Sequence, residues 1–464
     1  MFFLQSARGR AKLWRPVAAV GVALLLVGAT PLRHRPQPQV APGAPNILII
    51  VTDDQRDGMR MLPRTRRIFR KGVRFTNAFA TTPLCCPSRA SILTGRYAHN
   101  HGVIANTLRD GAEKYDARTG LPYLLKSAGY TTGIVGKYLN EVPLEEAPPY
   151  FDRYVRTEGR AYYGGRWNVN GVVHQLPGYS TSVIADAASM FILEQAITGA
   201  PWFLVIATVA PHNPAVPEEK YARLKVGRWK GNPATNSRRS DEGKPDYIRK
   251  ESYSLKDGRR LRRAQLRTLA SVDDLVVKVF DTLRSTSQDR NTLAFFLSDN
   301  GMMWGEFGLL KKGYPYTPSV RVPMLMRWPE RIRRAQVDAR LVANIDIAPS
   351  VLDAIGLPQD HDVPMDGRSL LSREWRRRWL LLEYWRNMGS GSPWASLRSD
   401  RWQYIESYTG RLHRELYDLR RDPWQLTNLM RSRLPAGAPD PARLAGLLHA
   451  FRSCRGTTGP RACP

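Results

Sequence analysis

The chain has 464 residues, of which 42% are hydrophobic, and it carries a formal net charge of +29 and four cysteines. This length exceeds the size at which one hydrophobic core stops growing, so we expect a large domain and a smaller one. The charge suggests nucleic acid, anionic membrane or acidic polysaccharide as partners. The arginines are spread along the chain without a nucleic-acid-binding signature, so nucleic acid is not expected, whereas a solvated surface and a polyanionic substrate both stay open.

The N-terminal residues contain a targeting segment and a spacer. Basic residues precede an apolar run over 17–32, which is typical of a secretory signal peptide with Val27-Gly28-Ala29 as a cleavage site. The run is short for a membrane span, and an uncleaved anchor is the alternative. We therefore expect residues 1–32 to export the protein as a signal peptide or N-terminal anchor. The proline-rich residues 33–45 are expected to form a disordered spacer.

Three apolar runs predict buried parallel strands, and they cover residues 46–51, 202–209 and 292–297. The polar residues that follow these runs include Asp53 and Asp54, His212, and Asp299 and Asn300. Ligand sites in open α/β sheets lie at such strand ends. Helical segments intervene, for example over residues 266–285. The sequence therefore predicts an α/β fold with a large mixed, mostly parallel sheet flanked by helices.

The remaining chain suggests where the domains divide. Residues 226–259 are polar and are expected to form a surface excursion within the large domain. A helix is expected to end at Gly356, and short strand-like pieces follow over residues 379–385 and 402–408. We therefore predict a catalytic domain over residues 46–356 and a smaller α+β C-terminal domain over residues 357–464.

The segment from Cys85 to Arg96 reads CCPSRASILTGR. Pro87 suits the first position of a short helix that ends at about Thr94, before Gly95. Cys85 would then lie at the helix N-terminus, where free N–H groups and the helix dipole favour a tetrahedral oxyanion such as sulfate or phosphate. A capped helix beside a buried cysteine pair is the structural alternative.

The four cysteines suit an oxidising compartment if Cys454 and Cys463 form a disulfide. Cys85 and Cys86 are adjacent and are geometrically poor partners for each other. Cys86 is expected to be a small buried hydrophobic residue. Zinc is not expected, because the cysteines lack the paired spacing of structural zinc sites.

From about Asn46 to Leu429 the chain resembles a sulfatase of the alkaline phosphatase superfamily. Ordered motifs carry the resemblance besides the Cys85 segment: Thr52-Asp53-Asp54, Gly136-Lys137, Pro211-His212, Asp299-Asn300-Gly301, Lys312 with Arg321-Val322-Pro323, and Glu415-Leu416-Tyr417-Asp418-Leu419 before Asp422-Pro423. Residues 136–141 and 97–102 further resemble the N-acetylglucosamine-6-sulfatase and heparan endosulfatase branch. That likeness implies a 6-O-sulfated glucosamine as the substrate.

The resemblance implies one divalent cation beside residue 85. Its ligands would be Asp53, Asp54, Cys85, Asp299 and Asn300. Hard oxygen ligands suit calcium better than zinc. The alternative for each pair of polar residues is that it only caps the end of a strand.

The resemblance also implies that a formylglycine-generating enzyme oxidises Cys85. The hydrated aldehyde would present two hydroxyls, one that attacks the sulfur of a sulfate monoester and one whose deprotonation later expels sulfate. Arg89 would hold the side chain of residue 85. Lys137 and Lys312 would bind sulfate, and His212 would contact sulfate and protonate the leaving alcohol.

One position departs from the commonest sulfatase pattern, because Leu139 stands where a second histidine is usual. Asn140 can replace its hydrogen bond but cannot carry a proton near neutral pH. Which residue takes the role of that histidine stays open. His99 and His101 either contact the substrate or are ordinary polar residues that follow the helix.

The sequence therefore predicts an exported, calcium-dependent sulfuric ester hydrolase that acts on a sulfated carbohydrate such as N-acetylglucosamine 6-sulfate. A phosphodiester or phosphonate monoester hydrolase on the same scaffold is one alternative. A noncatalytic polyanion-binding protein is the other.

Overall fold

The computed structural model describes residues 43–464 except 160, 236–242, 251, 360–362 and 386–391. The predicted signal peptide or anchor over residues 1–32 and most of the predicted spacer lie outside the described residues. Within the described part of the chain, no helix combines the length and the apolar character needed to cross a bilayer.

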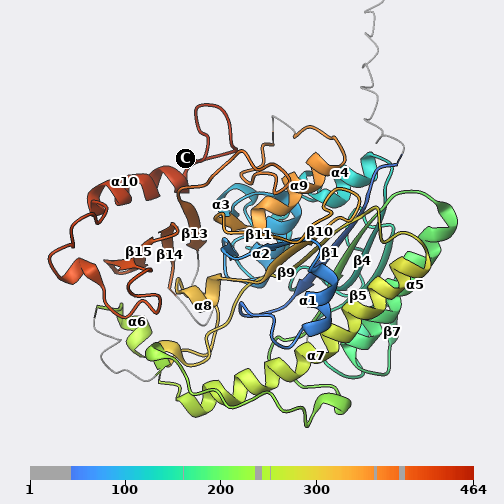
Figure 1. Ribbon diagram of the computed structural model, residues 1–464, viewed down its shortest axis with the longest axis horizontal. Coiled ribbons are helices and arrows are strands. Elements are labelled where there is room, and N and C mark those ends of the chain that lie inside the picture. Colours follow the sequence, from blue (N-terminus) through green and yellow to red (C-terminus); the bar gives the residue numbers. More distant parts are fainter. Residues whose placement is uncertain (1–42, 160, 236–242, 251, 360–362, 386–391) are drawn as a thin grey trace, which may run out of the picture. The chain divides into compact units, whose positions relative to one another are not determined.

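A large twisted sheet forms the centre of the fold (Figure 1). Among the described residues it has ten strands, in the order β11 (Gln336–Asp338), β2 (Val73–Phe75), β10 (Met324–Arg327), β9 (Thr292–Ser298), β1 (Asn46–Thr52), β8 (Trp202–Ala207), β4 (Thr131–Lys137), β5 (Arg153–Thr157), β6 (Arg166–Val169) and β7 (Val172–Gln175). β1 pairs in parallel with both β8 and β9. The three strands predicted from their apolar runs thus lie side by side, which confirms the predicted fold class.

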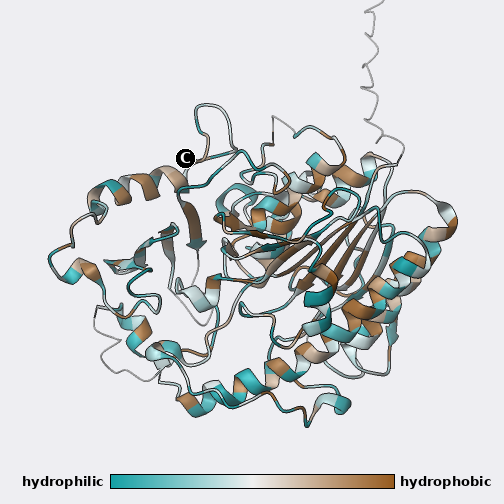
Figure 2. Cartoon of the chain, in the orientation of Figure 1, coloured by the Kyte–Doolittle hydropathy of each residue, from teal (hydrophilic) through white to brown (hydrophobic). Residues whose placement is uncertain are grey.

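The central strands are apolar on both faces because helices cover both sides of the sheet, and Figure 2 shows these strands in brown. In β1, Ile47 and Ile49 belong to one hydrophobic core, whereas Leu48 and Ile50 belong to the other. This alternation follows from the two-residue period of a strand. A strand buried on both faces therefore carries its polar residues only at its end, where Asp53 and Asp54 follow.

The helices are α1 (Pro63–Phe69), α2 (Cys85–Thr94), α3 (Ala98–His101), α4 (Leu121–Ser127), α5 (Ser180–Thr198), α6 (Asp246–Arg249), α7 (Leu255–Ser285), α8 (Thr317–Val320), α9 (Ile347–Ala354) and α10 (Pro441–Arg452). α7 begins eleven residues before the predicted helix at residue 266, because Ser254 and Asp257 form a capping box there. α6 and the start of α7 lie in the stretch predicted as a surface excursion. α9 ends two residues before Gly356, which has a left-handed backbone.

Two smaller sheets complete the structure. β3 (Ala78–Phe79) pairs with β12 (Val342–Ala343). Near the C-terminus, four antiparallel strands follow one another: β13 (Leu380–Tyr384), β14 (Trp394–Arg398), β15 (Trp402–Thr409) and β16 (Arg411–Asp418). This sheet shares a hydrophobic core with Phe79, Leu84 and Tyr97, which flank α2. The predicted domain boundary after residue 356 stays a prediction.

His99 joins α3 to the C-terminal sheet. Its Nδ1 lies 3.1 Å from Oε2 of Glu383, and its Nε2 lies 3.0 Å from the carbonyl oxygen of Cys454. The predicted disulfide between Cys454 and Cys463 is present. His101 contacts the hydroxyl of Ser91 instead. Both histidines therefore have protein partners, as the structural alternative for them expects.

We predict a pH-dependent contribution of His99 to stability. Burial lowers its pKa, but Glu383 outweighs burial and raises the pKa to about 9 from an ordinary value of 6.5. The folded protein therefore binds more protons than the unfolded chain between these values, so the contribution is complete below about pH 6.5 and is lost as the pH rises through about 9. Its size is about 1 to 3 kcal/mol.

The test records melting temperature against pH for the wild type and for His99→Gln, with His449→Gln on the exposed face of α10 as the control. The wild type should lose its advantage over His99→Gln as the pH rises to 9, whereas His449→Gln should follow the wild type throughout. Parallel curves for the wild type and His99→Gln would contradict this assignment.

Candidate active site

Two pairs of polar residues meet at the carboxyl ends of β1 and β9. Thr52 and Ser298 are partners in the parallel register, so the residues that follow them are neighbours. The backbone N–H of Asp54 donates to Oδ1 of Asp299 at 3.1 Å, and Nδ2 of Asn300 donates to Oδ1 of Asp54 at 2.7 Å. Asp54 has a left-handed backbone with φ of 66°, which is uncommon outside glycine but better tolerated by aspartate than by most residues. The structure therefore brings together the four residues that the sequence predicts as oxygen ligands.

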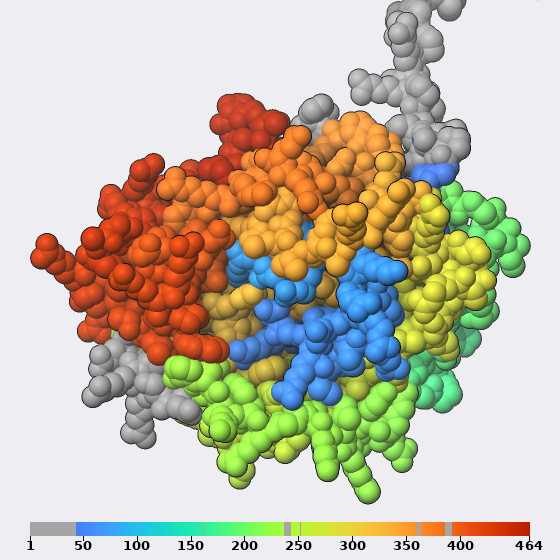
Figure 3. All heavy atoms as spheres, viewed as in Figure 1, coloured from blue at the N-terminus to red at the C-terminus, as the bar shows by residue number. Residues whose placement is uncertain are grey.

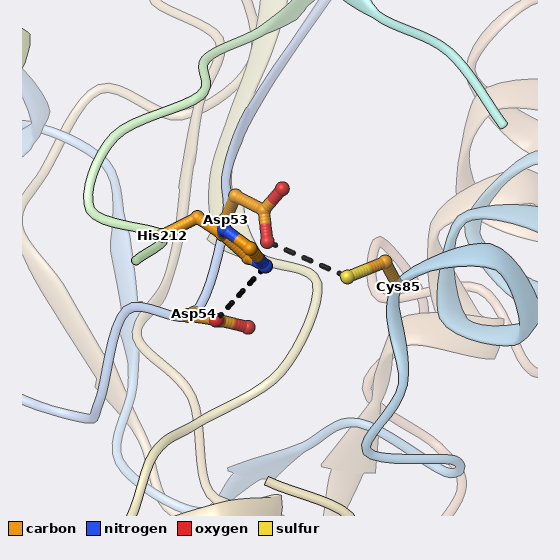
Figure 4. A group of neighbouring side chains, drawn as sticks. All are labelled: Asp53, Asp54, Cys85 and His212. Atoms are coloured by element: carbon orange, nitrogen blue, oxygen red, sulfur yellow. Dashed lines mark hydrogen bonds and ion pairs between the residues drawn. The ribbon is translucent and has the colours of Figure 1, made fainter. Parts of the chain in front are cut away.

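Cys85 faces this cluster from the first turn of α2 (Figure 4). Its Sγ lies 3.5 Å from Oδ1 of Asp53 and 2.8 Å from Nζ of Lys312. The prediction that Pro87 is the first residue of the helix was wrong, because α2 begins at Cys85 and Pro87 is its third residue. Gly95 ends the helix with a left-handed φ of 67°, as predicted. Cys85 therefore lies at the helix mouth, where the positive end of the dipole favours an anion.

Three cationic side chains surround Asp53. Nζ of Lys137, at the end of β4, lies 2.5 Å from Oδ2 of Asp53. Gly136 precedes this lysine, and any side chain there would collide with the carbonyl oxygen of Ala207 on β8, at 1.9 Å from an added Cβ. The position of Lys137 therefore depends on a strand pairing that only glycine at position 136 permits.

Arg89 and Lys312 complete the ring of cations. Arg89 lies 2.9 Å from Oδ2 of Asp299 and 3.4 Å from Oδ2 of Asp53, and it donates to the carbonyl of Lys137 at 2.8 Å. Nζ of Lys312 lies 2.5 Å from Oδ1 of Asp54 and 3.8 Å from Oδ1 of Asp53. Arg89 thus contacts two carboxylates and one backbone carbonyl, and its predicted hold on residue 85 stays a prediction.

The charges decide which groups are ionised. Burial of Asp53 opposes its ionisation, but the neighbouring cations, foremost Lys137, outweigh burial and hold the pKa of Asp53 well below its usual range. Burial, assisted by the charge of Asp53, raises the pKa of the Cys85 thiol to about 11. An unmodified Cys85 is therefore a neutral thiol at physiological pH, and a neutral thiol is a poor nucleophile.

The donor set fits a hard divalent cation. Ligand atoms of Asp53, Asp54, Cys85 and His212 lie within 4.8 Å of one another. The carboxamide oxygen of Asn300 is buried and has no hydrogen-bond partner among the described residues. A buried acceptor without a donor is costly, and a cation would satisfy it. Carboxylate and carboxamide oxygens suit calcium, whereas the site lacks the paired thiolates of structural zinc sites.

His212 lies at the accessible side of the cluster. Its Nε2 is 3.7 Å from Oδ2 of Asp54, and its side chain is 32% exposed, whereas Asp53 and Asp54 are almost completely buried (Figure 4). The hydroxyl of Tyr162 donates to the carbonyl of His212 at 2.6 Å and fixes its backbone. A group in this position can reach the departing part of a bound ester.

Leu139 and Cys86 contribute no polar group to the site. Both side chains are buried in a hydrophobic core of the sheet. The carboxamide oxygen of Asn140 is buried without a hydrogen-bond partner among the described residues. Neither Leu139 nor Asn140 supplies a titratable base, so His212 is the histidine that the described residues place at Cys85.

The supporting contacts of three residues, Ser88, Asn344 and Gln265, were missed in the sequence. The hydroxyl of Ser88 donates to the carbonyl of Asp299, and Nδ2 of Asn344 donates to that hydroxyl at 2.9 Å. Gln265 of α7 donates to the carbonyl of Pro211 at 3.1 Å and accepts from Nε1 of Trp304 at 2.6 Å. The only signal for Gln265 is a polar residue on the buried face of an amphipathic helix, and this signal does not identify its partners.

Comparisons with known proteins show the family of this chain. The family model described as Sulfatase matches residues 45–357, and a model described as N-sulphoglucosamine sulphohydrolase, C-terminal, matches residues 305–436. Human N-acetylglucosamine-6-sulfatase is 33% identical over 89% of this chain and 85% of its own length. An extracellular sulfatase Sulf-1 homolog of Caenorhabditis elegans is 35% identical over 70% of this chain. This chain spans about half the length of that protein, 48%.

A solved structure supports the fold. It shows a protein in complex with its substrate D-glucosamine-2-N,6-O-disulfate, and it is similar to this chain with a TM-score of 0.77 and 22% identity, over 88% of this chain and 97% of that one. These matches confirm the predicted resemblance and the predicted class of sulfuric ester hydrolase. The chain belongs to the sulfatase family.

Proposed function

We propose that this protein hydrolyses the sulfate monoester of a sulfated carbohydrate such as N-acetylglucosamine 6-sulfate, with formylglycine at position 85 and one bound calcium ion. The observation that carries the proposal is the contact of Cys85, at the mouth of α2, with Asp53 and Lys312. The thiol is the stand-in here for the formylglycine hydrate. Formylglycine would supply a hydrated aldehyde, which provides the nucleophile and a second hydroxyl for release of sulfate.

The cationic side chains are proposed to bind and orient the sulfate group. Lys137 and Lys312 both lie close to the carboxylates, and Lys312 also contacts Cys85. Fixed donors in a buried site stabilise the negative charge that develops on the ester oxygens. Arg89 holds Asp53 and Asp299 in place and thereby positions the ligand oxygens. His212, the most exposed of these groups, is proposed to protonate the leaving alcohol.

Asp53, Asp54, Asp299 and Asn300 are the residues proposed to hold the cation. When bound, the ion would lower the pKa of a hydroxyl at residue 85. Support for these ligands comes from the hard oxygen donors and from the buried oxygen of Asn300 that has no donor among the described residues.

The proposed substrate and compartment rest on the relatives. The human relative that covers most of the chain is named an N-acetylglucosamine-6-sulfatase, and others are named extracellular sulfatases. The protein is therefore proposed to be exported, to be modified by a formylglycine-generating enzyme, and to act on sulfated glucosamine.

The function is tested by sulfate release from the protein produced in its natural host. N-acetylglucosamine 6-sulfate and an aryl sulfate should both be hydrolysed, and faster than the matched aryl phosphate and phosphonate esters. Replacement His212→Ala should lower kcat on the sugar sulfate about 100-fold or more, and less on an aryl sulfate, whose leaving group needs less protonation. Formylglycine-bearing protein that releases no sulfate from either ester would refute the proposal, and a preference for the phosphonate would favour the alternative chemistry.

The cation is tested by its effect on folding, which does not depend on turnover. Calcium added to chelator-treated protein should raise the melting temperature, because a ligand that binds only the native state stabilises it, by about 2.7 kcal/mol at a hundredfold excess over Kd. Asn300→Ala should reduce this rise, whereas the control Asn77→Ala, at a half-buried position whose side chain contacts Asp400, should retain it. A melting temperature that does not change when calcium is added would contradict the proposed calcium site. So would an Asn300→Ala variant whose melting temperature rises as much as that of the wild type.

A further inference from the structure

We propose that a groove lined by arginines, next to the candidate active site, binds a sulfated polysaccharide chain. The proposal deepens the proposed function and rests on it for the chemistry of the ligand. The arginine groove is defined by six residues: Arg60, Arg66, Arg67, Arg70, Arg74 and Arg321. None of them is among the residues assigned to the reaction.

The arginine groove lies between α1 and the last three strands at one side of the sheet, β10, β2 and the edge strand β11, and its volume is about 930 Å³. Figure 3 shows the segment that carries α1, in blue, at the surface of the face in view. Asp57, which lies between β1 and α1 in the chain, also lines the arginine groove. The groove is therefore an open surface feature that a long ligand can enter.

The floor of the arginine groove is set by strand register. Arg74 of β2 is paired with Leu325 of β10 on one side and with Val337 of β11 on the other. Leu325 belongs to the same hydrophobic core as Phe69 of α1, so these strand positions face the helix. Val337 is 66% exposed. A cationic side chain between apolar strips suits a ligand that has both sulfate groups and sugar rings.

The wall of the arginine groove is the exposed face of α1. Arg66 and Arg70 are four residues apart and Arg67 and Arg70 are three apart, so these side chains are neighbours on the helix surface. Basic residues in the last turn stabilise a helix through its dipole, which gives a structural reason for Arg66 and Arg67. That reason does not extend to Arg74, which lies on a strand.

Charge pairing separates the two sides of α1. Arg64 faces α7 and pairs with Asp273, at 3.0 Å, and with Asp274. Of the six groove arginines, only Arg321 has an acidic partner among the described residues, and that partner is Asp57 at 3.0 Å. Like charges gathered in a groove repel one another and attract an anion. Guanidinium groups bind sulfate-like oxyanions through parallel hydrogen bonds.

The position of the groove ties it to the site. Asp57 follows Asp54 by three residues, so the two Cα atoms are at most about 11 Å apart. Thr76 and Arg321, at the same end of the groove, adjoin the end of β2 and the start of β10. A polymer with repeated sulfate groups is therefore proposed to occupy the groove while one of its sugars lies at the candidate active site, and a monosaccharide is too short to do both. A sulfated polysaccharide is favoured over a nucleic acid because the proposed reaction at the neighbouring site acts on a sulfate ester.

The test compares two variants with equal loss of charge. The groove variant carries Arg66→Gln, Arg70→Gln and Arg74→Gln. The control variant removes three exposed arginines near the C-terminus: Arg411→Gln, Arg433→Gln and Arg443→Gln. Binding of a fluorescent heparin dodecasaccharide is measured in a Cys85→Ala background, where the ligand is not consumed. Because all six arginines are exposed, both variants should keep the melting temperature of their parent.

The groove variant should bind the dodecasaccharide roughly tenfold or more weakly, since contacts to charged groups are lost, and the control variant should change much less. The difference should vanish near 1 M salt, where the screening length is about 3 Å. With Cys85 restored, the groove variant should show a raised KM for the polymer and unchanged kinetics on N-acetylglucosamine 6-sulfate. A second variant, Arg60→Gln with Arg67→Gln, should weaken polymer binding in the same way.

The proposal that the arginine groove binds the polysaccharide would be overturned if the groove variant bound as tightly as its parent. It would also be overturned if the control variant lost as much affinity as the groove variant. Single-stranded DNA of the same charge that binds the groove as tightly would overturn the assignment to a polysaccharide. The binding measurements in the Cys85→Ala background need no turnover, so their outcome is distinguishable from that of the proposed function, which would fail separately if the wild type released no sulfate from any ester.

Discussion

The buried carboxylate of Asp53 holds the candidate site together, because cationic side chains from three separate elements converge on it. Lys137 comes from β4, Arg89 from α2 and Lys312 from the chain after β9. A buried charge is tolerated only when it is paired, and removing Asp53 would take from Lys137 its carboxylate partner, whereas Arg89 would keep Asp299 and Lys312 would keep Asp54. The same carboxylate lies 3.5 Å from Sγ of Cys85. The arrangement of the cationic side chains and the raised pKa of Cys85 therefore both depend on the carboxylate that follows β1.

The sequence predicted the parts of the site that strand ends determine. A strand buried on both faces is recognisable as an apolar run, and its first polar residues must then lie at the sheet edge, as Asp53 and Asp299 do. The strand over residues 202–209 likewise predicted His212 near this edge, and the resemblance to sulfatases added Lys137 and Lys312, which the structure brings to the same edge. Their catalytic roles stay predictions.

The remaining contacts depend on long-range packing, which local pattern does not encode. The pairing of His99 with Glu383 joins residues 284 positions apart. Gln265 reaches the site only because α7 packs across the sheet. The start of α2 at Cys85 was missed for a similar reason, because proline is tolerated throughout the first turn of a helix and does not specify which residue begins it. The arginine groove likewise arises where α1 and β2 meet β10 and β11, which are distant from them in sequence.

The proposed reaction depends most on the chemical state of residue 85. The thiol seen here is buried and neutral, whereas the reaction needs a hydrated aldehyde. Mass spectrometry of the tryptic peptide Phe75–Arg89, from protein made by the natural host, measures that state directly. We predict a peptide in which the thiol of Cys85 has been replaced by an aldehyde oxygen and which reacts with carbonyl reagents. A peptide that retains two alkylatable cysteines, at positions 85 and 86, in active protein would contradict the proposed reaction.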